Sequence, residues 1–316
     1  MNNLYQKFHE DFYLKTGGYI PSIIQNQNLY PGDFFQIKDG QMVVLGNVFR
    51  DGIVDKNDCE IESNILLNAA NWNFNEGVSK PYSGRTNGEN ALEGNFEYSK
   101  QILAFKSAGS YWFTANNPKS TKLFNWNAFK DALIIKMTQT YYSFRELYVV
   151  NECATAEGWS LVVSGNSDAE LELATEAENF GLQDLFCHDT TKTISSRNIE
   201  YYQREDKRIP QFFKAKKLTV KNEKVEAFIR DLISKQKNKE DWANDFFNQD
   251  YYQDPNFVSQ KHCVNIASNV LDMLPPNTLN PNTALSYFKW EDANLEDINK
   301  LFIRYGSNGN FKNDIQ

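Results

Sequence analysis

The sequence predicts an α+β protein: a twisted, mostly antiparallel β-sheet body with short helices over residues 1–220, followed by a helical C-terminal tail over residues 221–316. The first observation is a change in the repeat of hydrophobic residues at Val220. Before it they recur every two residues, and after it they recur every 3.6 residues. The second is charge, because the last third of the chain is slightly basic although the whole chain has a net charge of -8. We therefore expect two regions of different kind.

A short helix and a series of short strands are expected at the start of the body. Hydrophobic residues spaced by three and four predict an amphipathic helix that Gly17-Gly18 ends. Asp39-Gly40 is a two-residue hairpin signal. Residues 64–100 are rich in Asn, Gly and Ser, so we expect a long loop or an irregular hairpin there. The helix is predicted from Leu4, Tyr5, Phe8 and Phe12, and the expected strands are Tyr19 to Ile24, Phe34 to Lys38 and Gln41 to Val48.

The second half of the body holds further strands and one helix. Glu146 to Thr155 and Trp159 to Ser164 are rich in β-branched and aromatic residues and are joined by Ala156-Glu157-Gly158, so we expect them to form a hairpin. Glu170 to Leu173 alternates as a half-buried strand does. The other expected elements are the strands Gln101 to Phe105, Ser110 to Ala115 and Gln211 to Val220, and a helix from Asn125 to Leu133.

Hydrophobic stripes at helical spacing predict three helices in the tail, and Pro275-Pro276 ends the second. Each large side chain that becomes fully buried contributes about 1.5–3 kcal/mol, so we expect the tail to pack on the body. The stripes are Val225, Phe228, Ile229, Leu232 and Ile233; Val264, Ala267, Leu271 and Leu274; and Leu295, Ile298, Leu301 and Phe302, with Phe228, Ile229, Leu232, Leu271 and Leu274 as the expected docking residues.

Composition narrows the class of protein. With 41% hydrophobic and 14% aromatic residues the chain can bury a real core. No hydrophobic run approaches the ~18 residues of a spanning helix, and the first residues lack the pattern of a secretory leader. The four cysteines are scattered, which favours a reducing compartment, so we expect a soluble cytoplasmic protein. A pI near 5.1 argues against a dedicated nucleic-acid binder.

Signatures of common enzymes are absent from the sequence, which has no GxxxxGK[ST], GxGxxG, GxSxG or HExxH. Cys187, His188 and Asp189 are consecutive, but neighbours in an extended chain point to opposite faces, so we expect a surface turn there. An enzyme centred on these three residues is the weakest alternative. We expect no catalytic residue and no cofactor.

Two candidate metal sites are also weak. His262-Cys263 lacks the four ligands of a structural zinc site. An acidic cluster lacks the glycine of the DxDxDG calcium loop, so a solvated loop is favoured and no metal is expected. The cluster consists of Asp51, Asp55, Asn57, Asp58, Glu60 and Glu62.

The stretch from Arg197 to Lys239 is basic, with 13 Lys or Arg against 6 Asp or Glu. Aromatic residues lie within it, and such a mixture suits anionic lipid head groups, near which each basic residue contributes about 1 kcal/mol. Solvated lysines on a strand and a helix are the alternative. The candidate lipid-facing residues are Lys214, Lys216, Lys217 and Lys221.

Several groups of residues follow one another in an order typical of one family. They are Gly18-Tyr19-Ile20-Pro21, Leu29-Tyr30-Pro31-Gly32-Asp33-Phe34 and Val43-Val44-Leu45-Gly46; Ala108-Gly109-Ser110-Tyr111-Trp112-Phe113 with the helix from Trp126 to Leu133; Leu147-Tyr148-Val149-Val150-Asn151-Glu152 with Trp159 to Ser164; and Gln211-Phe212-Phe213-Lys214-Ala215-Lys216-Lys217-Leu218. In this order they resemble the opening strands, the middle strand and its helix, the following strand pair and the last strand of bacterial gasdermins.

The gasdermin resemblance, which covers about residues 17–220, implies a latent pore-forming protein of bacterial defence and cell death. It implies a resting cytoplasmic monomer that the tail keeps closed, and an activating protease that releases the tail. Segments near 60–115 and 155–205 would then refold into membrane-spanning hairpins of a closed barrel. Anionic lipids of the inner membrane and further copies of the chain are the implied partners of the active form, and nucleic acid is not one.

The stretch from Ser234 to Asp241 is polar and free of hydrophobic anchors, so we expect an exposed connection that a protease can cut. Lys235, Lys237 and Lys239 are the candidate cleavage residues. The main alternative to a pore is a non-enzymatic structural or cargo component of a phage or contractile injection particle, because an acidic, Asn-rich chain without catalytic motifs also suits that role.

Overall fold

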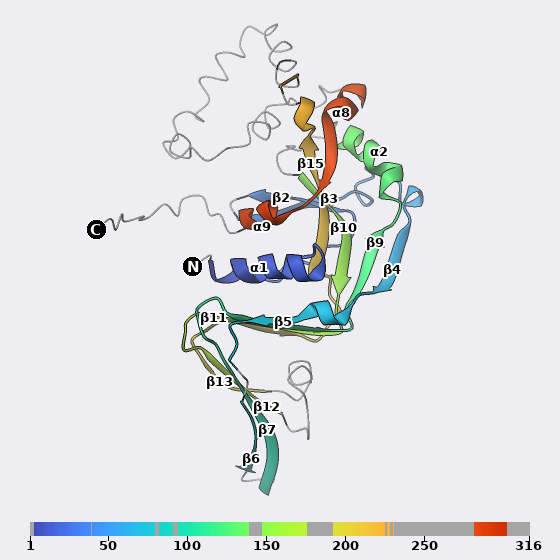
Figure 1. Cartoon of the computed structure of the whole chain (residues 1–316). Coiled ribbons are helices and arrows are strands. Elements are labelled where there is room, and N and C mark those ends of the chain that lie inside the picture. The colour runs from blue at the N-terminus through green and yellow to red at the C-terminus, as the bar shows by residue number, and fades with distance from the viewer. Residues whose placement is uncertain are drawn as a thin grey trace, which may run out of the picture.

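The computed structural model describes residues 3–38, 40–79, 82–90, 94–138, 147–175, 192–224, 226, 227, 230 and 281–301 (Figure 1). Three antiparallel sheets form the described part of the chain. They are accompanied there by the helices α1 (Asn3–Thr16), α2 (Trp126–Thr138), α8 (Pro281–Tyr287) and α9 (Leu295–Lys300), and by the short 3-10 turns η1 (Lys56–Asp58), η2 (Ala69–Trp72) and η3 (Asn222–Lys224).

The largest sheet has eight strands and is organised around β10 (Leu147–Thr155). β15 (Phe212–Val220) pairs with one side of β10. On the other side, β2 (Asp33–Lys38) pairs with the start of β10 and β9 (Lys119–Leu123) pairs with its end. β10 is buried along nearly its whole length, so the interior of the body is built on it.

The four remaining strands of this sheet lie outside these. β3 (Gln41–Asn47) pairs with β2, and β4 (Ile61–Leu66) pairs with β9. On the opposite side, β1 (Ile20–Pro21) and β16 (Phe288–Asp292) both pair with β15. A segment from the far end of the chain therefore completes the sheet.

Two four-stranded sheets complete the fold. One has the order β14-β11-β8-β5, and the other has the order β13-β12-β7-β6. The first consists of β5 (Asn73–Glu76), β8 (Tyr111–Asn116), β11 (Gly158–Ser164) and β14 (Ile199–Glu205); the second consists of β6 (Tyr82–Asn90), β7 (Gly94–Ala104), β12 (Glu170–Thr175) and β13 (Lys192–Arg197).

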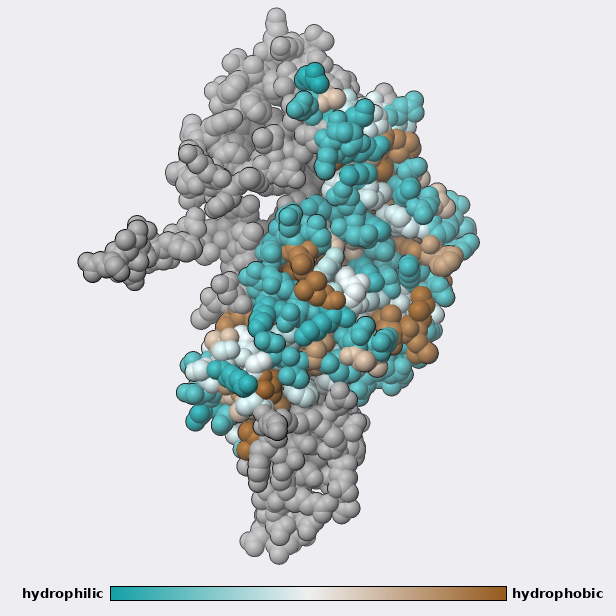
Figure 2. Space-filling model, viewed as in Figure 1, coloured by the Kyte–Doolittle hydropathy of each residue, from teal (hydrophilic) through white to brown (hydrophobic). Residues whose placement is uncertain are grey.

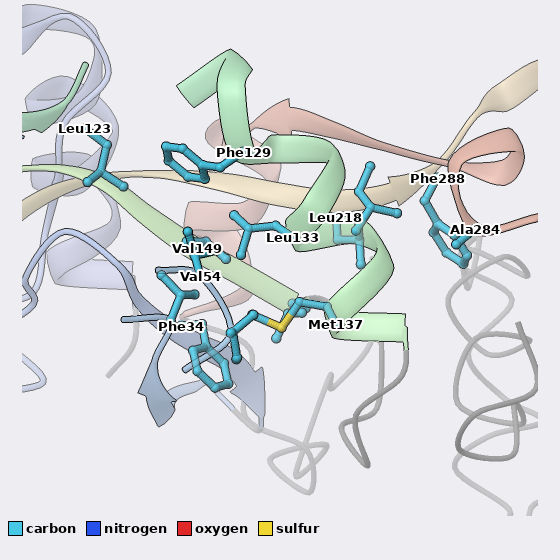
Figure 3. Packing of buried hydrophobic residues seen from close by; sticks show 14 of the residues in the cluster. Phe34, Val54, Leu123, Phe129, Leu133, Met137, Val149, Leu218, Ala284 and Phe288 are labelled. Carbon is cyan, nitrogen blue, oxygen red and sulfur yellow. The ribbon is translucent and has the colours of Figure 1, made fainter. Parts of the chain in front are cut away.

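The core is divided among the sheets. Phe8 and Phe12 of α1 pack with Trp72, Phe113 and Phe212 between the eight-stranded sheet and the sheet of β11. Below α2, a second cluster gathers residues from the body and from the tail (Figure 3). Its labelled members are Phe34, Val54, Leu123, Phe129, Leu133, Met137, Val149, Leu218, Ala284 and Phe288. The hydrophobic spacing that predicted α1 thus identifies its buried face.

Several expected elements are confirmed. α1 ends where Gly17 and Gly18 adopt φ of +75° and +97°, which a residue with a side chain rarely adopts. β2 and β3 form the expected hairpin, and Gly40 in its turn has φ +74°. Leu171 and Leu173 of β12 are buried, as the alternation predicted.

Two expectations about strands are wrong, and a third is wrong in part. The strand expected from Tyr19 to Ile24 is only Ile20–Pro21, since the chain then turns and the Asn26 N–H donates to the carbonyl oxygen of Ile23. The hairpin of residues 146–155 and 159–164 does not form: β10 and β11 lie in different sheets, because both edges of β10 are already paired. Of the two alternatives for residues 64–100, the long loop is wrong, because β5, β6 and part of β7 lie there, and β6 and β7 form a hairpin.

The tail also departs from the expected all-helical form. Residues 288–292 form β16, which joins the body's own sheet. Their aromatic residues, Phe288 and Trp290, favour a strand, and their spacing of two is also that of a strand. The third stripe is helical as expected, with Ile298 and Leu301 buried.

His9 should make the stability of the body depend on pH. Its ring is fully buried in α1, and burial lowers the pKa of His9 to about 4 from 6.5. The unfolded chain takes up this proton near pH 6.5 but the folded chain does so only near pH 4. The free energy of unfolding should therefore be highest above pH 6.5 and fall by about 3 kcal/mol as the pH drops toward 4.

Urea unfolding of wild type and His9→Gln over this pH window measures the effect. The Gln variant should have a flatter pH profile of unfolding free energy than wild type. Equal pH profiles for the two proteins would contradict a neutral, buried His9.

Candidate functional site

The four candidate lysines lie on or just after β15, and three of them contact the tail. Lys216 Nζ lies 2.6 Å from Asp292 Oδ1 at the end of β16. Lys221 Nζ donates to the carbonyl oxygen of Leu285 at 2.7 Å. The third, Lys217, contacts α9. Three of the four basic side chains that the sequence singled out are therefore held by C-terminal residues in this structure.

Lys217 pairs with a buried carboxylate. Its Nζ lies 2.7 Å from Asp297 Oδ1, and the side chain of Asp297 is only 2% exposed. The hydroxyl of Tyr148 donates to the same oxygen at 2.7 Å, and Lys300 Nζ lies 3.3 Å from it. Because a buried charge is tolerated only when it is paired and hydrogen-bonded, this arrangement fixes the position of α9 on the sheet.

Opposing effects set the pKa of Asp297. Burial alone would raise it, but the charge and hydrogen bond of Lys217, the backbone N–H of Asn294 and the charge of Lys300 outweigh burial. The net result is a pKa of Asp297 below its ordinary value of 3.8. The carboxylate is therefore ionised at neutral pH and strengthens tail packing there.

Lys214 differs from the other three lysines because its partners belong to the body. Its Nζ lies 3.7 Å from Glu152 Oε2 and 4.4 Å from the ring centre of Tyr19. The Tyr19 hydroxyl donates to the other carboxylate oxygen of Glu152 at 2.5 Å. The ion pair of Lys214 therefore does not involve the tail.

Hydrophobic and backbone contacts accompany the ion pairs. The antiparallel register between β16 and β15 runs from Val220 opposite Phe288 to Lys216 opposite Asp292. Figure 3 shows Phe288 and Ala284 beside the end of β15 in the same cluster as Leu218. The tail thus covers an edge, a hydrophobic face and the basic side chains of one strand.

The second feature is a four-stranded ribbon formed by two long hairpins. The two small sheets have matching strand orders, and each strand of one is joined in sequence to its counterpart in the other: β5 to β6, β7 to β8, β11 to β12 and β13 to β14. Figure 1 shows the β6, β7, β12 and β13 part extending away from the rest at an angle. The ribbon is therefore bent between its two halves.

Residues with unusual backbone conformations lie at the bend. Gly77, Gly109 and Asn198 have φ of +67°, +76° and +54°, and each lies between the two halves of its strand. A Cβ at Gly77 would lie 2.2 Å from Ser110 Oγ. Three of the four strand connections thus use a conformation that turns the chain sharply.

Serines stabilise the bend by hydrogen bonds. Ser164 Oγ donates to the carbonyl oxygens of Ser107 and Ser110 at 2.6 and 3.0 Å. The hydroxyl oxygens of Ser107 and Ser110 lie 3.0 Å apart. On one face of the bend a separate hydrophobic cluster joins the two halves, made of Leu103, Phe105, Val162, Ala169, Leu171 and Leu173. Straightening the ribbon would disrupt both sets of contacts.

α1 connects the tail to the ribbon. Gln6 Nε2 donates to Asn299 Oδ1 of α9 at 3.1 Å, and the next residue, Lys7, lies 3.0 Å from Glu76 Oε1. Glu76 is the last residue of β5 and precedes the bend at Gly77. α1 therefore contacts both the tail and the ribbon through two consecutive residues.

Many residues that the sequence singled out lie outside the described residues. They are the linker residues Lys235, Lys237 and Lys239, the docking residues Phe228, Ile229, Leu232, Leu271 and Leu274, and Cys187, His188, Asp189, His262 and Cys263.

Sequence reasoning missed the acidic partners of the lysines. Asn294 and Asp297 form a capping box at the start of α9, in which the Asn294 side chain accepts from the backbone of Asp297 and the Asp297 carboxylate accepts from the Asn294 N–H. This spacing is a helix-start signal that the sequence does contain. It could have placed Asp297 at the start of a helix, but not next to Lys217.

The acidic cluster has structural roles where its bonds are described. The Asp55 side chain accepts from the Asn57 N–H and caps η1, and Asp51 Oδ2 accepts from the Asn47 N–H. Within the described ranges, no group of three or more His, Cys, Asp or Glu residues could hold a metal ion. In the same residues we find no helix of the length and hydrophobicity needed to cross a membrane.

Comparisons with known proteins identify no family model that matches the chain and no curated protein that matches it. Among solved structures, the chain is similar to a bacterial gasdermin from Bradyrhizobium tropiciagri, with 12% identity, 62% of this chain and 80% of that chain covered, and a TM-score of 0.23. It is also similar to the gasdermin A3 membrane pore, with 12% identity, 60% and 76% coverage and a TM-score of 0.22. Both TM-scores lie below 0.5, so we argue function from this chain's own residues.

Proposed function

We propose that this chain is a latent pore-forming protein that its C-terminal tail holds inactive, and that proteolysis converts it into a membrane-permeabilising oligomer. The observation that carries the proposal is the cover that the tail places over β15. Lys216, Lys217 and Lys221 are neutralised or hydrogen-bonded by tail groups that a single cut upstream could release. The resting form is then a cytoplasmic monomer, and the active form acts at the inner membrane.

The charge balance of the tail supports this proposal. With the tail in place, Asp292 and Asp297 offset the lysines. Without it, Lys216 and Lys217 of β15 and Lys221 just after it lose these partners. Each basic residue near an anionic surface contributes about 1 kcal/mol, so binding to anionic lipid should gain about 3 kcal/mol on release.

The dimensions of the ribbon also support it. A membrane-spanning β-strand needs about 9–11 residues. β6 has 9 residues and β7 has 11, and they pair continuously from Tyr82–Ile102 to Asn90–Gly94. These hairpin strands lie within a segment, near 60–115, that the gasdermin resemblance implies would insert into the membrane. The bend and its serine bonds would hold them in the resting arrangement.

Release requires cutting the connection between body and tail. Lys235, Lys237 and Lys239 are the proposed sites, and Phe228, Ile229, Leu232, Leu271 and Leu274 are proposed to strengthen docking. A short tether holds the tail at an effective concentration in the millimolar range. Cleavage removes that tether without breaking a contact, so the tail can then dissociate.

A dye-release assay on vesicles tests the proposed function. A site for a sequence-specific protease is placed at Lys237 in the full chain. Uncut protein should release no dye, and cut protein should release it from anionic vesicles. On neutral vesicles the binding should be weaker by about 100-fold, since three lysines lose their attraction. Cut protein that is folded, monomeric and inert on anionic vesicles would contradict the pore and favour the structural alternative.

Asp297→Asn should loosen the tail of the uncut protein. Removing one partner of a buried ion pair costs about 3–5 kcal/mol, so hydrogen exchange of the β16 amides should accelerate by about 100-fold or more. Glu291→Gln is the matched control, because Glu291 pairs with Lys289 inside the tail at 2.7 Å. Equal exchange rates in the two variants would show that the Lys217 pair does not hold the tail.

The same ion pair gives tail docking a pH dependence. Because the folded pKa of Asp297 is lowered, its contribution is fully present above the ordinary value of 3.8 and is lost as the pH falls through the folded value. The difference in β16 protection between wild type and Asp297→Asn should therefore disappear in strong acid. A difference that persists there would contradict this origin.

A disulfide across the bend tests whether the ribbon must move. Ser107→Cys with Ser110→Cys places two thiols where the hydroxyls are 3.0 Å apart. The oxidised, cut protein should bind vesicles but release dye at least about tenfold more slowly, and reductant should restore release. Wild type treated with the same oxidant is the control. Unchanged release by the oxidised variant would exclude a required opening of this bend.

A further inference from the structure

β4 is an open and unusually exposed edge strand. Among the described residues it pairs with β9 alone, and five of its six residues are exposed. The ladder to β9 is interrupted between Glu62 and Ile65, where Asn64 has φ +61°. One edge of this strand therefore presents backbone groups to its surroundings.

Three large hydrophobic side chains are exposed at this edge. Ile61 is 41% exposed and Leu66 is 71% exposed, and Phe124, which follows β9, is 64% exposed. The Phe124 N–H donates to the carbonyl oxygen of Glu60, so Phe124 lies beside the start of β4. Figure 2 shows hydrophobic surface on the right of the molecule, where β4 and β9 lie in Figure 1. An exposed hydrophobic edge strand is a ready template for pairing with another chain.

Charge selects the kind of partner. Asp55, Asp58, Glu60 and Glu62 are all exposed in and just before β4. Two such acidic edges would repel each other, so β4 does not suit pairing with its own copy. It suits a strand edge that carries basic side chains and lacks a partner.

β15 has such an edge when the tail is gone. Its Lys216 to Val220 segment is now paired with β16, and Phe288 of β16 packs in the same cluster as Leu218 and Val220. Tail release would leave unpaired backbone groups, an uncovered hydrophobic face and basic side chains on one strand. A replacement strand should be hydrophobic and acidic, and β4 is both.

We propose that, once the tail has left, the vacated edge of β15 pairs with β4 of a second copy of this chain. This inference rests on the proposed release of the tail and names the surface through which the active form assembles. The two edges lie on different parts of one molecule, so each copy offers one edge to each neighbour. Head-to-tail contacts of this kind form a ring when the rotation between neighbouring copies closes, and an open filament when it does not. While β16 is in place, the β15 edge is occupied and assembly is blocked.

Lysine substitutions on β4 test the surface in the full chain with the cleavable tail. Ile61→Lys with Leu66→Lys places positive charge opposite the β15 lysines. After cleavage on anionic vesicles, this variant should bind as wild type does but form about tenfold fewer oligomers, because like charges replace hydrophobic anchors. Leu14→Lys is the matched surface control, since Leu14 is 64% exposed on α1. Val43→Lys with Val44→Lys tests β3, the other edge strand that could pair with β15, where both side chains are 38% exposed.

Zero-length carbodiimide coupling of carboxylates to amines provides the second measurement. In cut wild type, cross-linked peptides should join Glu60 or Glu62 of one copy to Lys216, Lys217 or Lys221 of another, and uncut protein should lack them. Oligomers that persist in the β4 variant would overturn the inference. Cross-links that join β15 to β3 would also overturn it, and so would assembly that is lost in the β3 variant but not in the β4 variant.

The two proposals fail in different ways. Cut wild type that releases dye without these cross-links overturns the β4 surface and leaves the pore standing. Cut wild type that forms the cross-links but releases no dye supports the surface and contradicts the pore.

Discussion

Strand β15 is hydrogen-bonded along both edges, and the rest of the described structure depends on that double pairing. β10 pairs with one edge, while β1 and β16 pair with the other. Buried backbone N–H and C=O groups need partners, so a strand at this depth cannot be left with an open edge without a large free-energy cost. The C-terminal segment supplies the missing pairing. The body thus depends on its tail to complete the sheet.

Charge makes this pairing specific. A chain with net charge -8 carries a cluster of lysines on β15, and the tail brings Asp292 and Asp297 to two of them. Asp297 also accepts from Tyr148 of β10, so one carboxylate links the tail to two adjacent strands of the body. Hydrophobic contacts alone would hold a tail loosely in register. The buried carboxylate specifies where α9 must lie, because displacing it would leave its charge without partners.

Helix α1 lies between the tail and the ribbon. The Tyr13 hydroxyl donates to the carbonyl oxygen of Ala293 at 3.1 Å, and on its other side the helix packs Phe8 and Phe12 against the sheet of β11. Tail contacts and ribbon contacts therefore meet on one rigid element. A ligand or a cleavage event shifts a conformational equilibrium only through contacts that differ between the two states. If the tail is released as we propose, the contacts of α1 would connect that release to the ribbon.

The sequence by itself determined the local features of this protein. Spacings of three and four predicted α1, Asp39-Gly40 predicted the β2–β3 hairpin, and the alternation at Leu171 and Leu173 predicted β12, since each of these signals acts between residues close in the chain. Only the tertiary structure decided which strands pair: β10 and β11 are neighbours in sequence yet lie in different sheets, because strand partners are chosen by edge availability across the whole fold. It also decided that the lysines of β15 meet Asp292 and Asp297, some 80 residues further on, since no local pattern specifies a contact over that distance.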